Sequence, residues 1–242
     1  MMKNRTRNMV TAAVCLADGS TAFADPIMGI LETWTGYLLK YGNDPGEQLC
    51  TDDFAGHLAH NVNLSAKAIV GVEALAQIKK LAGDEAAYAD LHAKAAEMAA
   101  GWQQRAFAGD HYVLAFGSED TWSLKYNLVW DKLFDSHLFD ESVYTLELPY
   151  YVKMSNKYGA PLDSRATYTK SDWIVWCAAM TADPSLRNAL IAPIAAYLRE
   201  SSTRVPFSDW YDTITGNYVH FRGRSVQGGM YMPLLVKRGL KV

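Results

Sequence analysis

Apolar residues recur at helical spacing along most of this chain, and this periodicity constrains the fold more than any other feature. In residues 85–106 and 184–200 the apolar residues form one stripe, with charged and polar residues opposite. Residues 58–78 and 172–180 are apolar nearly all round, which is typical of helices buried on most sides. No segment shows convincing strand–turn–strand alternation. The sequence therefore predicts an all-α protein.

Connections between the predicted helices alternate between short and long. Helices are expected near residues 8–17, 26–41, 58–81, 85–106, 122–134, 140–156, 171–181, 184–200 and 226–237. The long connections, rich in Asp, Trp, Tyr, Arg and Gly, span residues 42–57, 107–121, 157–170 and 201–225. Helical hairpins stacked side by side produce this alternation. The long loops would gather at one end, which is the expected functional face because binding groups concentrate on loops.

Composition and charge fit a soluble globular protein. Of the 242 residues, 50% are apolar and 20% are charged, with a net charge of −3 and no basic block. A general nucleic-acid binder needs clustered Lys and Arg, so no nucleic-acid partner is expected. No apolar run is long enough to span a bilayer, so no membrane partner is expected either. The cysteines Cys15, Cys50 and Cys177 are odd in number and far apart, which suits neither a disulfide framework nor a CxxC metal site.

The N-terminal residues 1–24 loosely imitate a secretory signal. They combine a basic start, a short apolar run and an Ala-Phe-Ala segment before Asp25. The apolar run is short, however, and an Asp-Gly-Ser break at 18–20 precedes the supposed cleavage site. We interpret the segment as the first helix of the fold, with a cleaved signal as the alternative, and expect one domain over residues 1–242.

The first long loop carries acidic residues and histidines just before a helix. Asp52 or Asp53 could cap that helix by accepting hydrogen bonds from its first N–H groups. Spacings of three and four residues would also place Asp53, His57 and His60 on one helical face, together with Asn61. A metal site would need three such ligands, but the spacing matches no strong metal signature. Capping beside a polar site wall is the favoured interpretation, and no metal is expected.

Aromatic residues dominate the end of the second long loop and the helix after it. Trp122, Tyr126 and Trp130 recur at helical spacing, and so do Asn127 and Asp131. Taken alone, this pattern favours an aromatic core stripe, with Asp131 and the lysine that follows it in solvent.

The third long loop contains a candidate ion pair and a candidate helix start. Asp163 and Arg165 are close enough in sequence to pair, and Asp172 lies where a helix begins. Thr167 and Lys170 have the spacing of a nucleophile with a lysine base, although a pattern with two defined positions is weak.

The fourth long loop places two acids around two aromatic residues. Asp209 and Asp212 flank Trp210 and Tyr211, and Arg224 follows. Asp209 could simply cap a turn. If all four loops meet, carboxylates at one mouth could take different protonation states, and the aromatic faces would suit a sugar ring or a small polar substrate.

Five segments closely resemble the six-helical-hairpin domain of the glutaminase A family. They read PGEQLCTDDFAGHLAHNVNLS, TWSLKYNLVWDKLF, NKYGAPLDSRATYTKSDWIVW, RVPFSDWYDT and GRSVQGG. The resemblance runs from about Asn8 to Leu235. It implies an α/α toroid, similar to that of many glycoside hydrolases, and hydrolysis of L-glutamine to glutamate and ammonia. Family members look like secreted or periplasmic multidomain proteins, although this chain carries no convincing signal peptide.

Relative to that family, the chain starts inside the toroid. Nine predicted helices fall short of the twelve that close a ring of six hairpins, so we expect an incomplete ring from the C-terminal portion of a larger enzyme. An open ring would expose the apolar flank of its first inner helix, and chains could associate through that surface.

The leading hypothesis from the resemblance is a glutaminase A-like hydrolase domain without a cofactor. Its catalytic residues are incomplete if the truncation removes some of them. The catalytic candidates are Asp52, Asp53, His57, Asp131, Asp172 and Asp209. The residues expected to bind a small-molecule substrate are His60, Asn61, Trp122, Tyr126, Asn127, Trp130, Asp163, Arg165, Lys170, Trp173, Trp210, Tyr211, Asp212 and Arg224. Among them, Arg165 or Arg224 would bind a substrate carboxylate through two hydrogen bonds.

Two alternatives remain open at the level of sequence. Aromatic walls and paired acids also suit a carbohydrate-active hydrolase of the six-hairpin type, which uses two carboxylates on a glycosidic bond. A non-catalytic remnant that binds a ligand or supports a partner is the other alternative.

Overall fold

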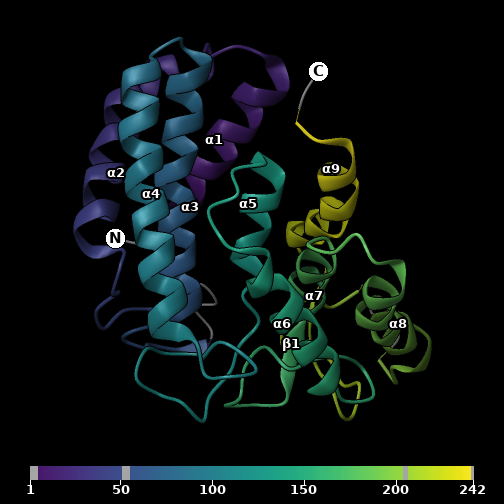
Figure 1. The fold of residues 1–242 in the computed structure, drawn as a ribbon. Helices are drawn as coiled ribbons and strands as arrows, with labels where there is room; N and C mark the ends of the chain where they lie inside the picture. Colours follow the sequence, from purple (N-terminus) through teal and green to yellow (C-terminus); the bar gives the residue numbers. More distant parts are fainter. Residues whose placement is uncertain (1–4, 51–54, 204–206, 241–242) are drawn as a thin grey trace.

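The computed structural model describes residues 5–50, 55–203 and 207–240. Helices dominate it (Figure 1), and the regular strands among the described residues form one two-stranded sheet. The prediction of an all-α fold is confirmed. None of the helices in these ranges is both long enough and apolar enough to cross a membrane.

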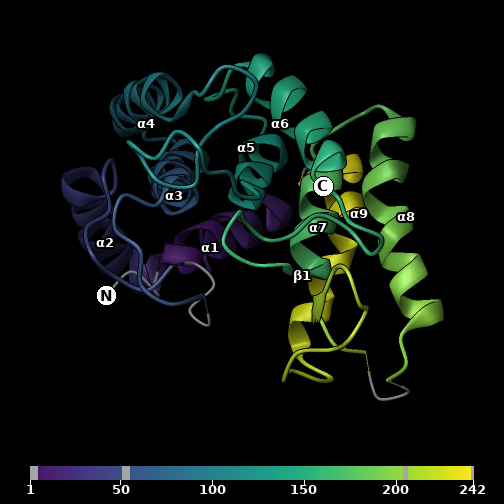
Figure 2. The same cartoon turned by 90° about the horizontal axis from the view of Figure 1, so that it is seen from below.

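Within the described residues, four helical hairpins are followed by a last helix. The hairpins are α1 (Arg5–Asp18) with α2 (Met28–Tyr41), α3 (Val62–Leu81) with α4 (Glu85–Ala106), α5 (Val129–Phe134) with α6 (Glu141–Lys153), and α7 (Ser171–Ala178) with α8 (Pro184–Glu200), and α9 (Met232–Arg238) comes last. A 3-10 helix directly precedes each of α2, α5 and α9: η2 (Asp25–Ile27), η4 (Tyr126–Leu128) and η5 (Ser225–Tyr231), respectively. Figure 2 shows α3, α5 and α7 toward the middle, with α4, α6 and α8 outside them. Inner and outer helices therefore alternate along the chain.

Burial separates the inner helices from the outer ones. All residues of α3 from 62 to 78 are buried, which explains why its sequence is apolar nearly all round. Helix α4 buries one stripe, in which the fully buried Trp102 donates its indole N–H to the carbonyl oxygen of Val62 at 2.8 Å. The apolar stripe of α4 therefore packs against α3 and leaves the polar side of α4 in solvent.

Helix α3 begins at Val62, four residues later than predicted. The Asn61 side chain caps it by accepting the N–H of Leu64 at 2.7 Å. His60 has a φ of 60°, a left-handed backbone conformation that interrupts a helix. His57, His60 and Asn61 therefore do not share a helical face, and that prediction was wrong.

Two other segments differ from the helical prediction. Residues 122–125 are not helical, because their backbone bonds to a neighbouring loop, and the helix predicted there begins at η4. A two-stranded antiparallel sheet joins β1 (Tyr168–Lys170) to β2 (Trp210–Asp212), with Lys170 opposite Trp210. Strands of three residues are too short for alternation to be visible in a sequence.

One edge of the fold exposes apolar side chains. Val10, Phe23 and Ile30, from the first hairpin and its connection, are exposed and line a groove of about 360 Å³. Tyr231 and Leu234, at the C-terminal end of the described chain, are exposed too. Of these residues only Val10 lies on α1, so an exposed apolar flank of the first inner helix, and association of chains through it, stay predictions.

Candidate functional site

The four long loops meet at one end of the stack, the lower end in Figure 1. Backbone hydrogen bonds join each loop to the next one: Phe116 N–H to His60 O, Ser164 N–H to Trp122 O, and Thr213 N–H to Thr167 O. We call this surface the rim, meaning the described residues of 42–61, 107–125, 157–170 and 201–224. The alternation of short and long connections predicts this arrangement.

A cluster of four charged side chains lies at the rim, and we call it the ion cluster. Lys170 Nζ lies 3.0 Å from Asp172 Oδ2 and 3.4 Å from Asp209 Oδ2. Arg224 donates to both oxygens of Asp209, at 3.2 Å from Nε and 2.5 Å from Nη2. The side chains of Lys170, Asp172 and Asp209 are at most 3% exposed, whereas that of Arg224 is 33% exposed.

The small sheet builds the ion cluster from segments far apart in sequence. Lys170 ends β1 opposite Trp210, so Asp209, one residue before β2, comes beside it. The N–H of Ser171 donates to the carbonyl oxygen of Asp209 at 2.9 Å. Asp172 lies in the first turn of α7, where the helix dipole favours a carboxylate.

The charges of the ion cluster keep Asp209 ionised. Burial acts to raise the pKa of its carboxyl, but the hydrogen bonds from Arg224 and the charge of Lys170 outweigh burial, and the pKa lies below its usual value. Asp209 therefore serves as a permanent negative charge that orients two cations. It cannot donate a proton near neutral pH.

Aromatic rings adjoin the ion cluster. Trp173 stacks on Tyr126 with ring centroids 4.2 Å apart and planes 4° apart. Lys170 Nζ lies 4.5 Å from the centre of the Trp173 ring, and Trp176 packs edge-on at 4.8 Å. Trp173 and Trp176 are partly exposed, so they form an accessible aromatic surface beside the buried charges.

The predicted pair of Asp163 and Arg165 is confirmed. Arg165 donates from Nε to Asp163 Oδ1 at 2.9 Å and from Nη2 to Oδ2 at 2.7 Å. Its Nη1 also donates to the carbonyl oxygen of Ala55 at 3.2 Å, which links the first and third loops. The hydrogen bonds from Arg165 to Asp163, like those from Arg224 to Asp209, direct the guanidinium group toward a carboxylate of this chain. A substrate carboxylate would therefore have to approach another edge of either group.

The start of α3 and the η4 turn meet through two asparagines. Asn127 donates from Nδ2 to Asn63 Oδ1 at 3.1 Å, and both side chains are buried. Next to them is a cavity of about 20 Å³, lined by Asn63, Ser123 and Asp163 among others. That volume suits one water molecule rather than a substrate.

Several predicted site residues lie elsewhere or are used structurally. Asp52 and Asp53 lie outside the described residues. His57 and His60 are exposed and pair with Glu47 at 3.3 Å and Asp44 at 2.8 Å. The two histidines therefore face carboxylates of their own loop rather than the ion cluster.

Asp131 is buried, so its predicted exposure to solvent was wrong. It is 2% exposed, and it accepts hydrogen bonds from Leu138 N–H at 2.9 Å and Tyr144 Oη at 2.7 Å. Burial raises the pKa of Asp131, although the Tyr144 hydroxyl opposes that effect. Asp131 joins α5 to α6 at a short connection, away from the ion cluster. Lys132, also predicted in solvent, lies 2.6 Å from Glu141 and is 24% exposed.

Other aromatic and hydroxyl candidates are part of the core or of the loop structure. Trp122, Trp130 and Trp210 are buried, and Tyr211 is fully buried and stacks on Tyr197 at 3.7 Å. The Thr167 hydroxyl donates to Asp212 at 2.5 Å. Because Lys170 contacts Asp172 and Asp209 instead, the structure does not form the suggested pair of Thr167 with a lysine base.

Sequence reasoning missed four residues around the rim: Asn63, Lys125, Glu147 and Trp176. Lys125 and Glu147 are single charges in largely apolar stretches and are both buried. A lone charge in an apolar stretch could have identified Lys125 and Glu147, because a charged residue is seldom fully buried unless it is paired. Such a charge therefore indicates a partner elsewhere in the fold.

Gly229 of η5 lies too close to the ion cluster to carry a side chain without strain. A Cβ atom there would lie 3.0 Å from Trp176 Nε1 and 3.1 Å from Asp172 Cβ, whereas one at Gly228 would meet nothing within 4 Å. We expect Gly229→Ala to lower the free energy of unfolding by about 1–3 kcal/mol, and Gly228→Ala to change it by less than about 0.5 kcal/mol. Urea denaturation measures both, and equal effects would show that η5 does not press against α7.

The described residues contain no group of three or more His, Cys, Asp or Glu side chains that could hold a metal ion. Fold and rim together define an all-α protein of stacked helical hairpins with charged and aromatic side chains at its long-loop end. The chain belongs to the glutaminase A family, because that family's six helical-hairpin domain matches residues 3–234.

Two curated relatives are similar to this chain over most of its length. The protein named glutaminase A from Aspergillus oryzae is 37% identical over 214 residues, covering 86% of this chain and 31% of the relative. A protein named "Probable glutaminase" from Arthroderma benhamiae is 32% identical over 237 residues, covering 85% of this chain and 27% of the relative. The chain therefore spans less than a third of the length of these relatives.

Proposed function

We propose that the rim forms part of a site that hydrolyses the side-chain amide of L-glutamine to glutamate and ammonia. The observation that carries this proposal is the ion cluster, which joins the third and fourth loops, beside the accessible surface of Trp173 and Trp176. The family and the printed names of the two relatives support this choice of substrate.

The charges of the ion cluster suit an amino-acid substrate. Glutamine carries an α-carboxylate, and Arg224 offers a guanidinium that is one-third exposed and held in place by Asp209. Positive charge from Lys170 and Arg224 would also stabilise the oxyanion that forms when water attacks the amide carbonyl. In this proposal Asp172 and Asp209 orient Lys170 and Arg224. The ring faces of Trp173 and Trp176 form one side of the substrate-binding site. The acid–base role is proposed for Asp52 and Asp53 of the first loop, which lie outside the described residues, and not for His57, which pairs with Glu47.

The glycosidase alternative is less well supported by the carboxylates of the rim. Most glycosidases need one carboxylic acid that stays protonated and one carboxylate that stays ionised. Asp209 has a lowered pKa, and Asp131, whose pKa is raised, is enclosed between α5 and α6. Of these two carboxylates, Asp209 supplies an ionised group at the rim, whereas Asp131, with its raised pKa, lies away from it.

Thermal unfolding of the whole chain with L-glutamine, L-glutamate or D-glucose tests the proposal, together with an assay for released ammonia. A ligand at 100 times its dissociation constant should stabilise the fold by about 2.7 kcal/mol. We expect stabilisation by glutamine that Trp173→Leu abolishes and that Trp34→Leu, a matched change on α2, leaves intact. Both tryptophans are partly exposed, but only Trp173 adjoins the ion cluster.

Each other outcome of that experiment has a defined meaning. Stabilisation by glucose alone would favour the glycosidase alternative. Stabilisation by glutamine without ammonia release would favour a binding site without catalysis. If no ligand raises the unfolding temperature, the proposed site is wrong for this chain.

A further inference from the structure

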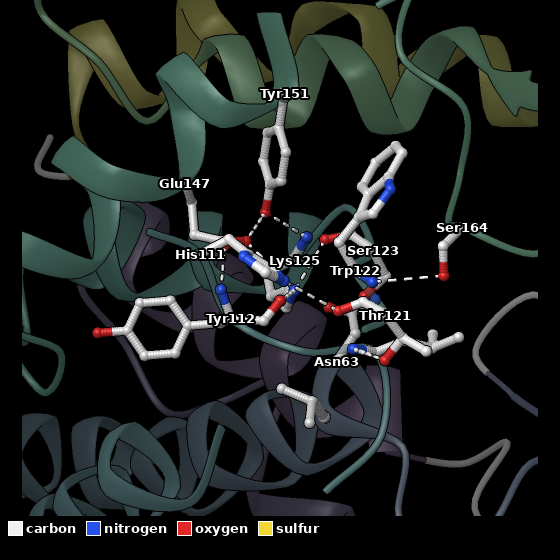
Figure 3. Close-up of polar contacts among 12 residues, drawn as sticks. Asn63, His111, Tyr112, Thr121, Trp122, Ser123, Lys125, Glu147, Tyr151 and Ser164 are labelled. Carbon is white, nitrogen blue, oxygen red and sulfur yellow. Dashed lines mark hydrogen bonds and ion pairs between the residues drawn. The ribbon is translucent and has the colours of Figure 1, made fainter. Parts of the chain in front are cut away.

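A buried ion pair lies behind the second rim loop, between Lys125 and Glu147 of α6 (Figure 3). Lys125 Nζ lies 3.3 Å from Glu147 Oε2, and the two side chains are 0% and 2% exposed. Burial lowers the pKa of Lys125, an effect that the charge of Glu147 opposes. Neither group can reach a ligand, so the pair is not catalytic.

The two charged groups join two parts of the second loop. Within the loop, Glu147 Oε1 accepts the N–H of Tyr112 at 2.7 Å, and Lys125 Nζ donates to the Tyr112 carbonyl oxygen. At its end, Lys125 Nζ donates to the carbonyl oxygen of Ser123 at 3.0 Å. The pair therefore connects Tyr112 to Ser123 within the loop and satisfies three backbone groups of these two residues.

Tyr151 completes this network from the same outer helix. Its hydroxyl donates to Glu147 Oε2 and accepts the backbone N–H of Lys125 at 2.9 Å. Burial and the nearby carboxylate raise the pKa of Tyr151 well above its usual value, so the hydroxyl keeps its proton. One oxygen atom of Tyr151 thus connects α6 to the backbone at Lys125.

That backbone position directly precedes two residues of η4 that contact the site and the start of α3. Tyr126 follows Lys125 and stacks on Trp173, and Asn127 bonds to Asn63 at the start of α3. A shift of the backbone at Lys125 would therefore move the ring against which Trp173 rests.

We propose that Tyr151 and Glu147 are positioning residues for the rim, which place Tyr126 and hence Trp173 by holding the backbone at Lys125. This inference rests on the proposed function for its ligand, but its structural part can be measured without any ligand. It assigns a role in the site to the outer helix α6, whose own side chains do not line the ion cluster.

Helix α6 supplies a closely matched control residue. Tyr144 is 2% exposed and donates its hydroxyl to a buried carboxylate, Asp131, at 2.7 Å. Tyr151 is fully buried and also donates to a buried carboxylate, Glu147. Tyr151→Phe and Tyr144→Phe each remove one oxygen from the same helix, but the Tyr151 hydroxyl also accepts an N–H of the second loop.

Hydrogen exchange of individual amides, followed by NMR, tests the structural part. In Tyr151→Phe we expect the Lys125 amide to exchange at least tenfold faster, because its acceptor is gone, and the Trp173 indole N–H resonance to shift. In Tyr144→Phe we expect neither change. The Leu124 amide, which donates to the Leu162 carbonyl oxygen at 2.9 Å, serves as the internal reference.

Binding of L-glutamine tests the part that concerns the site. We expect Tyr151→Phe to weaken binding at least fivefold and Tyr144→Phe to leave it unchanged. Equal responses of the two variants, or faster Lys125 exchange with unaltered glutamine affinity, would overturn the inference. If the wild-type chain does not bind glutamine, the proposed function fails, and an unshifted Trp173 resonance in Tyr151→Phe would separately overturn the positioning role.

Glu147→Gln keeps the inference testable if Tyr151→Phe does not fold. Gln retains an acceptor for the Tyr112 N–H, but in place of the Oε2 atom that accepts from the Tyr151 hydroxyl it presents an –NH2 group, which donates to that hydroxyl oxygen in competition with the Lys125 N–H. We expect the Lys125 amide to exchange at least tenfold faster while the Tyr112 amide stays protected. Unchanged exchange at Lys125 in this variant would overturn the proposal.

Discussion

We expect Asp209→Ala to lower the free energy of unfolding by about 3–5 kcal/mol, because removing one partner of a buried ion cluster leaves uncompensated charge. Lys170, which is 3% exposed, would lose one of its two carboxylate partners. Arg224 would lose both hydrogen bonds that it donates to Asp209. Urea denaturation at neutral pH measures the change. Asp90→Ala, which breaks an exposed pair with Lys94, is the control and should have little effect.

The effect of Asp209→Ala should also depend on pH. The carboxyl pKa of Asp209 in the folded chain lies below its usual value, which is about 3.9 in an unfolded chain. Ionised Asp209 therefore stabilises the fold above about pH 4, and this contribution is lost as the pH falls through the lowered folded-state pKa. The difference between wild type and variant should be constant near neutral pH and shrink in acid. A difference that grows in acid would contradict this account.

Lys125→Met is expected to cost about 3–5 kcal/mol of unfolding free energy, because it leaves the carboxylate of Glu147 buried without its cation. It also removes the donor to the carbonyl oxygens of Tyr112 and Ser123. The control is Lys132→Met, since Lys132 is partly exposed and pairs with the exposed Glu141. We expect that control to cost about 0–1 kcal/mol.

A double-mutant cycle tests whether Lys125 and Glu147 act together. In Lys125→Met combined with Glu147→Leu, no buried charge is left unpaired, so the double variant should be more stable than the sum of the single changes predicts. We expect a coupling free energy of at least about 1 kcal/mol. Additive effects would show that the two groups do not interact across the second loop.

Local sequence patterns determined much of the fold. Helices α4 and α8 begin and end where the periodicity of residues 85–106 and 184–200 predicts. Residues 58–78 are apolar nearly all round, and this correctly indicated an inner helix. The alternation of short and long connections correctly predicted that the long loops lie together. The Asp163–Arg165 pair was also predictable, because its partners are two residues apart. These features depend on neighbours within one or two helical turns, which a single sequence displays directly.

The tertiary structure decided which side chains meet at the rim. Asp209 reaches Lys170 because two three-residue strands pair, and neither strand is long enough to show alternation. Asp131 is buried because Tyr144, on the next helix, supplies its hydroxyl. Lys125 and Glu147 are 22 residues apart and were not recognised, since a charge can be buried only where the fold brings it a partner. Periodicity reports which face of a helix is buried, whereas the partner of a buried charge depends on contacts between distant segments.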